Sequence, residues 1–170
     1  MIVAVIALVL LGVVAVLPTV TTRVRRESWA PPATQLVLLA AAGVLAPIHH
    51  ALTGFPRAAA VVLGVAAAAG GASPIVRAVF RLAGRGQSSA LRPQNVLRGG
   101  GVIGVLERAS IAAAILAQWP AGIAIVLAVK GLARYPELRD AKVSEQFIIG
   151  TFASVLWAAG CAGVVVALVG

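Results

Sequence analysis

The chain has 170 residues, of which 61% are hydrophobic and only 11% are charged, and its mean hydropathy is +1.02. A soluble domain carries roughly 25% charged residues, so this composition excludes an ordinary water-soluble fold and indicates an exterior that faces lipid. The net charge of +9 would favour nucleic acid in a soluble protein. Here the basic residues lie between apolar runs, where they set topology and contact anionic head groups, so we expect no nucleic-acid partner.

The first two predicted membrane segments flank an arginine cluster. Residues 1–17 form an apolar run that ends at Pro18, and the cluster at 23–26 follows it. No basic residue precedes the run, so we interpret it as an anchor with its N-terminus outside rather than a cleavable signal peptide. The second segment is predicted at 35–51, with Pro47 near its outer end.

The third predicted segment, 58–76, is very rich in alanine and glycine. Small residues allow helices to approach closely in lipid, where no hydrophobic force drives them together. We therefore expect this helix to be central. Gly70, Gly71 and Pro74 make it a candidate for a break in the helix as well.

A basic stretch follows the third segment. Arg77, Arg81 and Arg85 recur at four-residue spacing, which places them along one face of a helix that leaves the membrane. Arg98 precedes a glycine-rich helix start whose amide groups could also bind phosphate. We expect these four arginines to contact the head groups of anionic lipids.

Residues 101–134 are predicted to form a helical hairpin. One continuous helix would be about 50 Å long, well beyond a bilayer core of roughly 30 Å. Trp119-Pro120 divides the stretch, because Pro suits the first position of a new helix and Trp suits an interface. The arms are predicted at 102–118 and 121–133. The second arm is short, so both a full crossing and a re-entrant hairpin remain open.

The last predicted segment follows a charged loop, with Ser144 as its expected N-cap. The fold class is thus all-α: a polytopic transmembrane bundle in which residues 1–170 form a single membrane domain. Its six predicted segments are 1–17, 35–51, 58–76, 102–118, 121–133 and 146–168.

The distribution of basic residues predicts the topology. Three lie between the first two segments, five in 77–100 and four in 130–145, whereas the other two connections hold only Arg57. The positive-inside rule then favours three cytoplasmic basic loops and both termini outside. Twelve arginines against two lysines, with abundant Ala, Gly and Val, indicate a GC-rich bacterial genome. The predicted location is the bacterial cytoplasmic membrane.

Glu107 and Arg108 are the most unusual residues, because they lie inside an otherwise apolar helix. Ionisable groups there are costly and indicate a functional site. The hairpin returns Lys130 and Arg134 to a similar depth, so we expect Glu107 to pair with Lys130 or else Arg134, and Arg108 to meet Glu145. The full predicted cluster comprises Glu107, Arg108, Lys130, Arg134, Glu137, Glu145 and Thr151. It is either an ion-pair network that locks the hairpin or a site for a substrate, ion or lipid head group.

The sequence holds few other residues of the kinds that bind metals or cofactors. Cys161 is the only cysteine and Asp140 the only aspartate, so Cys-clustered metal sites and Asp-rich Mg²⁺ motifs are excluded. The adjacent His49 and His50 point to different faces of a helix and cannot easily share a metal or haem. We expect no metal and no cofactor, and a protein that is not an enzyme.

Three motifs in the last 70 residues carry a resemblance. They are G-x-L-E-R at 104–108, A-V-K-G-L-A-R-Y-P-E-L at 128–138 and E-Q-F-I-I-G-T at 145–151. This pattern resembles the C-terminal membrane region of a family of uncharacterised bacterial integral membrane proteins. The resemblance covers under half of the chain and implies no activity, but it singles out the same charged residues.

The favoured function is transport or the binding of a lipid or partner, with anionic membrane lipids as the expected partners. One alternative is an assembly subunit of a larger membrane complex, and a second is an enzyme acting on a lipid or isoprenoid with Glu107 as general base. Small-residue pairs such as Gly64-x-x-x-Ala68 and Ala159-x-x-x-Gly163 favour packing within the chain. A homo-oligomer stays open.

Overall fold

The computed structural model describes residues 2–21, 29–48, 51–83 and 100–170. Regular structure in these residues is entirely helical, which confirms the all-α prediction. The elements are α1 (Ile2–Thr21), α2 (Ala30–Leu45), η1 (Ala46–Ile48), α3 (Gly54–Leu82), α4 (Gly100–Leu116), α5 (Pro120–Ala133), η2 (Glu137–Arg139) and α6 (Ala141–Val169).

Three of these helices are long and apolar enough to cross a membrane. They are Ala30–Ile48, which joins α2 to η1, and the two 29-residue helices α3 and α6. Ile2–Pro18 and Pro120–Ala133 are apolar but shorter. This composition of helices indicates a multi-pass membrane protein.

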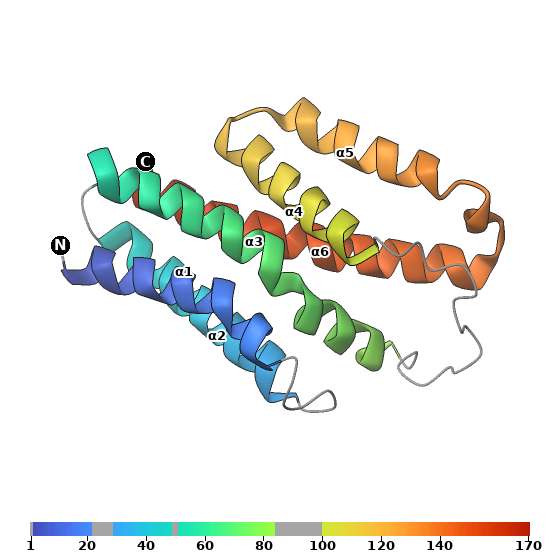
Figure 1. The fold of residues 1–170 in the computed structure, drawn as a ribbon, viewed down its shortest axis with the longest axis horizontal. Helices are drawn as coiled ribbons and strands as arrows, with labels where there is room; N and C mark the ends of the chain where they lie inside the picture. Colours follow the sequence, from blue (N-terminus) through green and yellow to red (C-terminus); the bar gives the residue numbers. More distant parts are fainter. Residues whose placement is uncertain (1, 22–28, 49–50, 84–99) are drawn as a thin grey trace.

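The long helices α3 and α6 run side by side at the centre of the bundle (Figure 1). Helix α1 packs on α3 and α2, and α4 packs on both α3 and α6. Helix α5 lies outermost, with α4 as its main neighbour. The small residues of α3 are therefore central, as expected from the sequence.

The ends of the helices divide into two groups (Figure 1). The starts of α1 and α3 and the end of α6 lie at one end of the bundle, where the amide of Leu52 donates to the carbonyl of Leu168. We call the other end the basic end, and the starts of α2, α4 and α6 and the ends of α3 and α5 lie toward it. The turn between α4 and α5 stops short of the end that holds the termini.

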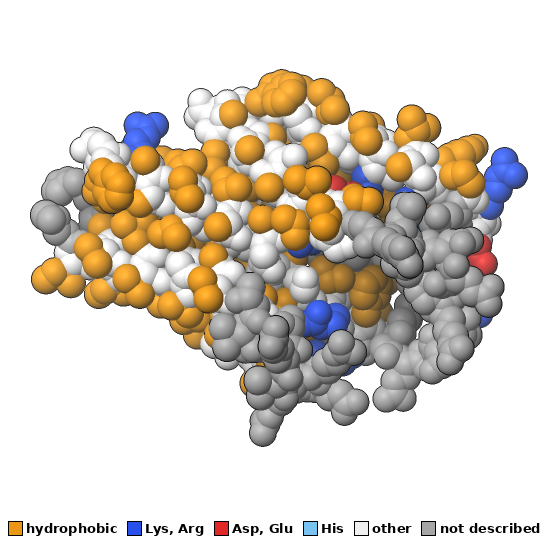
Figure 2. Space-filling model, in the orientation of Figure 1, with side chains coloured by type: hydrophobic (Ala, Val, Ile, Leu, Met, Phe, Trp, Pro, Cys, Tyr) orange, Lys and Arg blue, Asp and Glu red, His pale blue; other side chains and the backbone are white. Residues whose placement is uncertain are grey.

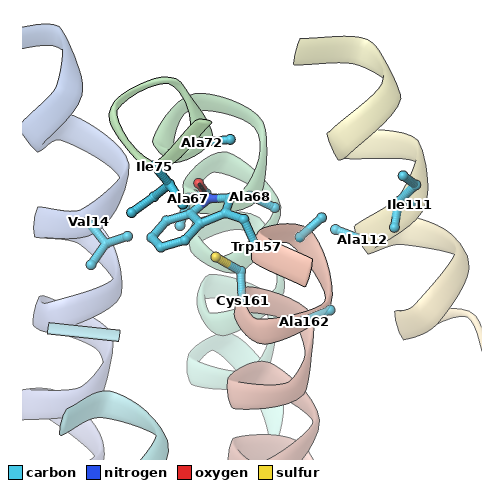
Figure 3. Close-up of a cluster of buried hydrophobic side chains, with 11 residues drawn as sticks. Val14, Ala67, Ala68, Ala72, Ile75, Ile111, Ala112, Trp157, Cys161 and Ala162 are labelled. Carbon is cyan, nitrogen blue, oxygen red and sulfur yellow. Dashed lines mark hydrogen bonds between the residues drawn. The ribbon is translucent and has the colours of Figure 1, made fainter. Parts of the chain in front are cut away.

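Trp157 of α6 organises the larger of two buried clusters. Its ring lies between Val14 of α1 and the small residues of α3 (Figure 3). Its indole Nε1 donates to the carbonyl oxygen of Ala67 at 3.1 Å. A Cβ at Gly71 would collide with the ring, so only glycine allows this approach.

The hairpin prediction is confirmed, because α4 ends at Leu116 and α5 begins at Pro120. Gln118 adopts a positive φ of 54° in the turn between them. The Trp119 ring then folds against α5, where a Cβ at Gly122 would lie 2.6 Å from its Cε3 atom. A glycine in the first turn of α5 thus makes the tight connection compatible with a bulky aromatic residue.

Prolines shift the boundaries of the first two helices from those predicted. Pro18 lies inside α1, because a proline in the last turn removes only one hydrogen bond. Helix α2 begins at Ala30 rather than residue 35, with proline in the first turn, where amide groups have no helical acceptor. It ends at Leu45, before a 3₁₀ turn that contains Pro47.

Helices α3 and α6 are longer than the predicted segments. Helix α3 begins at Gly54 and continues past Pro74 to Leu82, bending near its middle (Figure 1). Helix α6 begins at Ala141, and its N-cap is Asp140 rather than Ser144, because Asp140 Oδ1 accepts from the amides of Lys142 and Val143. The expected loop around Ser144 is therefore part of α6.

The two small-residue pairs have different environments. A Cβ at Gly64 would collide with Val165 of α6, so Gly64 packs within the chain as predicted. The prediction for Gly163 is wrong, because nothing lies within 4 Å of a Cβ placed there. Gly163 is on the exposed side of α6, away from the neighbouring helices.

Candidate functional site

The charged cluster begins with an ion pair between the two arms of the hairpin. Lys130 Nζ of α5 donates to Glu107 Oε2 of α4 at 2.5 Å. The two side chains are 21% and 16% exposed, so the pair is largely withdrawn from the surface. The predicted partner of Glu107 is confirmed. The antiparallel hairpin brings these residues together from positions 23 apart in the chain.

Arg108 turns away from this pair and binds the central helix. Its Nε and Nη2 atoms donate to the carbonyl oxygen of Ala69 on α3, at 2.9 and 2.6 Å. The expected contact with Glu145 is therefore replaced by a backbone contact. Successive helical residues point about 100° apart, so Glu107 can face α5 while Arg108 faces α3. Arg108 is only 8% exposed.

The small residues of α3 explain why a backbone carbonyl is within reach. Ala67, Ala68 and Ala72 are fully buried and present little side-chain volume toward their neighbours. A carbonyl oxygen has two lone pairs, so Ala69 can accept from a guanidinium in addition to a helical amide.

The Arg108 side chain runs back along α4 toward the start of that helix. A Cβ at Gly104 would lie 3.1 Å from Arg108 Nη1, and the guanidinium supplies the three atoms nearest to that position. Side chains on a helix tilt toward its N-terminus. The positive charge is thus displaced to the level of Gly104, roughly 6 Å along the axis from Gly100.

Helix α6 contributes an aromatic ring near the ion pair. Lys130 Nζ lies 5.9 Å from the centre of the Phe147 ring, within the range of a cation–π contact. Thr151 follows one turn later, on the same face of α6. Its Oγ1 atom is buried and has no hydrogen-bond partner in the described part of the chain.

The remaining charged members of the predicted cluster are exposed where their side chains are described. Arg134 is the C-cap residue of α5, and both it and Glu145, in the second turn of α6, are exposed. Each makes an interaction of its own. Glu137 begins η2, but its side chain lies outside the described residues. Direct contacts therefore join Glu107, Lys130 and the Phe147 ring, with Arg108 anchored beside them.

The predicted head-group arginines are only partly described. Arg77 and Arg81 lie in the last turns of α3, as expected, and Arg81 stacks with its Cζ atom 4.5 Å from the centre of the Trp29 ring. This contact fixes the start of α2 against the end of α3. Arg85 and Arg98 fall in 84–99, outside the described residues.

Several polar features of the bundle have no clear sequence signal. Gln35 of α2 is fully buried, and neither atom of its amide has a partner among the described residues. The indole of Trp157 and the guanidinium of Arg108 both bind carbonyls of α3, two residues apart. The run of alanines in α3 indicates accessible backbone carbonyls, because small side chains expose backbone acceptors. It does not indicate which side chains donate to those carbonyls.

Within the described residues, no group of three or more His, Cys, Asp or Glu side chains could hold a metal ion. Comparison of the chain with protein families, curated proteins and solved structures finds no match. The function must therefore be inferred from the charged cluster itself.

Proposed function

We propose that this chain is a multi-pass protein of the bacterial cytoplasmic membrane, with six membrane segments, its basic end in the cytoplasm and both termini outside. The grouping of helix ends supports this topology, since every basic connection begins and ends toward one end of the bundle (Figure 1). Hydrophobic side chains cover most of the face in Figure 2, and most of its described charged groups gather toward the basic end.

We further propose that the base of the α4–α5 hairpin binds an anionic ligand. The observation that carries this proposal is an imbalance of charge. Glu107 contributes one negative charge, and Lys130 and Arg108 contribute two positive charges, so the three residues sum to +1. The carboxylate is already engaged by Lys130. Arg108, at 8% exposure, is bonded to a carbonyl and shares the charge of the same carboxylate with Lys130.

One carboxylate shared by two cations offsets their charge only in part, and an uncompensated buried charge is expensive in a low-dielectric environment. An anion beside Arg108 would balance the charge of these three residues and use guanidinium donors that do not reach Ala69, since a guanidinium binds oxyanions with a planar set of N–H groups. The ion pair also argues against the enzyme alternative, because a carboxylate held by an ammonium is a poor general base. Binding is therefore favoured over catalysis.

The test is the thermal stability of the protein purified in neutral detergent. A ligand that binds only the folded state raises the unfolding temperature. Inorganic phosphate or added phosphatidylglycerol should stabilise the wild type, and Arg108→Gln should lose that stabilisation. Arg57→Gln removes one positive charge at the opposite end of α3 and serves as the matched control. An equal response in Arg108→Gln, or no response to either anion, would reject an anion site and leave the cluster as a structural ion-pair network.

A further inference from the structure

We infer that the anion at the hairpin base is the phosphodiester of a membrane lipid with a net negative charge, bound with its acyl chains along the outer face of α4. This inference rests on the proposed anion site and specifies its ligand. It is carried by the level of the guanidinium, by the side chains around it and by the net charge of Glu107, Arg108 and Lys130.

The level of the Arg108 charge fits a lipid phosphate. Arg108 itself lies about 12 Å along the axis from Gly100, but its Nη1 atom reaches the position where a Gly104 side chain would be. The charge is thus only roughly 6 Å from the start of the helix, toward the basic end. Phosphates lie at such a boundary, outside the hydrocarbon core.

Gly104 provides the space for this arrangement. Any side chain at position 104 would press on the guanidinium, because Nη1 lies 3.1 Å from the Cβ position. Nη1 takes no part in the two bonds to Ala69, which use Nε and Nη2. The Arg108 guanidinium is therefore held by α3 through Nε and Nη2. Its remaining nitrogen, Nη1, is directed along α4 toward the start of the helix.

The surface of α4 around this level is apolar and exposed. Val102, Ile103, Val105 and Leu106 are each at least 40% exposed. A free phosphate gains nothing from such a surface, whereas the acyl chains of a lipid pack on it. In a membrane these side chains are in contact with lipid wherever α4 is embedded. A ligand with an anionic head and apolar chains therefore matches both parts of the site.

The net charge of the three contacting residues favours a diester over a monoester. Glu107, Arg108 and Lys130 sum to +1, which one phosphodiester charge neutralises. A phosphomonoester or inorganic phosphate carries about −1.5 to −2 at neutral pH and would leave an excess negative charge. Lys130 is held by Glu107 at 2.5 Å, so it is not available to balance that excess without breaking the ion pair.

The experiment is native mass spectrometry of the intact chain released from neutral detergent with defined ligands. Phosphatidylglycerol is compared with phosphatidylcholine, with inorganic phosphate and with glycerophosphoglycerol, which has the head group but no acyl chains. We expect the wild type to retain phosphatidylglycerol preferentially. Loss of one charge-assisted contact should reduce its affinity about tenfold in Arg108→Gln but not in Arg57→Gln.

Gly104→Leu keeps every charge and fills the space beside the guanidinium, so it should also lose the lipid. If Arg108→Gln does not fold, Gly104→Leu tests whether lipid binding depends on the guanidinium. Arg108-dependent binding of phosphate or glycerophosphoglycerol that equals that of phosphatidylglycerol would overturn the lipid assignment and retain the anion site. Absence of Arg108-dependent binding of any anion would overturn both. Equal retention of phosphatidylglycerol and phosphatidylcholine would also overturn the inference.

Discussion

The ammonium of Lys130 lies 2.5 Å from a carboxylate oxygen of Glu107, and this contact joins the two arms of the hairpin. Helix α5 has α4 as its main neighbour, so few other contacts hold it in place. The ion pair, the cation–π contact of Lys130 with Phe147 and the Trp119 turn together position α5. The pair is therefore a structural element of the site as well as part of its charge balance.

Removing one partner of this pair should be worse than removing both. Glu107→Gln alone or Lys130→Met alone leaves a largely buried charge, and each should lower the unfolding free energy by about 1–3 kcal/mol. The double variant should recover part of the loss. Reversible unfolding in mixed micelles measures these differences, with Lys142→Met, an exposed site on α6, as the single-charge control. A double variant as unstable as the sum of the singles would show that the two residues do not interact.

The contact between Gly71 and Trp157 should tolerate no added methyl group. A Cβ at Gly71 would collide with the ring, which is fixed by its bond to Ala67, so Gly71→Ala should cost about 1–3 kcal/mol. Gly163→Ala is the matched control on α6, because its added methyl group meets nothing within 4 Å. Thermal unfolding in detergent compares the two. Equal melting temperatures would contradict the packing described for Trp157.

The start of α6 should depend on Asp140 rather than on Ser144. Asp140 Oδ1 accepts from the amides of Lys142 and Val143 at 2.8 and 3.3 Å, so Asp140→Ala should cost about 1 kcal/mol. Asp140→Asn retains a capping oxygen and should cost much less. Ser144→Ala lies inside the helix and should be nearly neutral. Chemical unfolding reports all three changes, and a larger loss at Ser144 would place the start of the helix where the sequence alone predicts it.

The topology predicts which positions react from each side of the membrane. The buried Cys161 is first changed to Ala. A single cysteine is then introduced at Thr53, Gln118 or Arg139, which are all exposed. In oriented vesicles, Arg139→Cys should react from the cytoplasmic side and Thr53→Cys from the opposite side. Gln118→Cys should react with Thr53→Cys if the hairpin crosses fully. Reaction of Thr53→Cys and Arg139→Cys from the same side would reject the proposed topology.

Local signals in the sequence account for most of the helices. Long apolar runs must form helices in lipid, because every backbone polar group needs an internal partner there. Trp119-Pro120 marked the turn of the hairpin, and antiparallel geometry then placed Lys130 beside Glu107. The errors fall at helix ends, at Pro18, Ala30 and Asp140. At such positions proline and capping side chains decide between neighbouring residues by about 1 kcal/mol.

The sequence by itself determined that the chain is an apolar, all-helical protein with its basic residues grouped between segments, because hydropathy and charge act locally along the chain. Only the tertiary structure decided the partner of Arg108 and the role of Gly104. The Ala69 carbonyl is 39 residues away, and every residue carries such an acceptor. Which carbonyl a guanidinium reaches depends on how closely α4 packs against α3. That distance follows from the small side chains of the whole bundle rather than from any motif around Arg108.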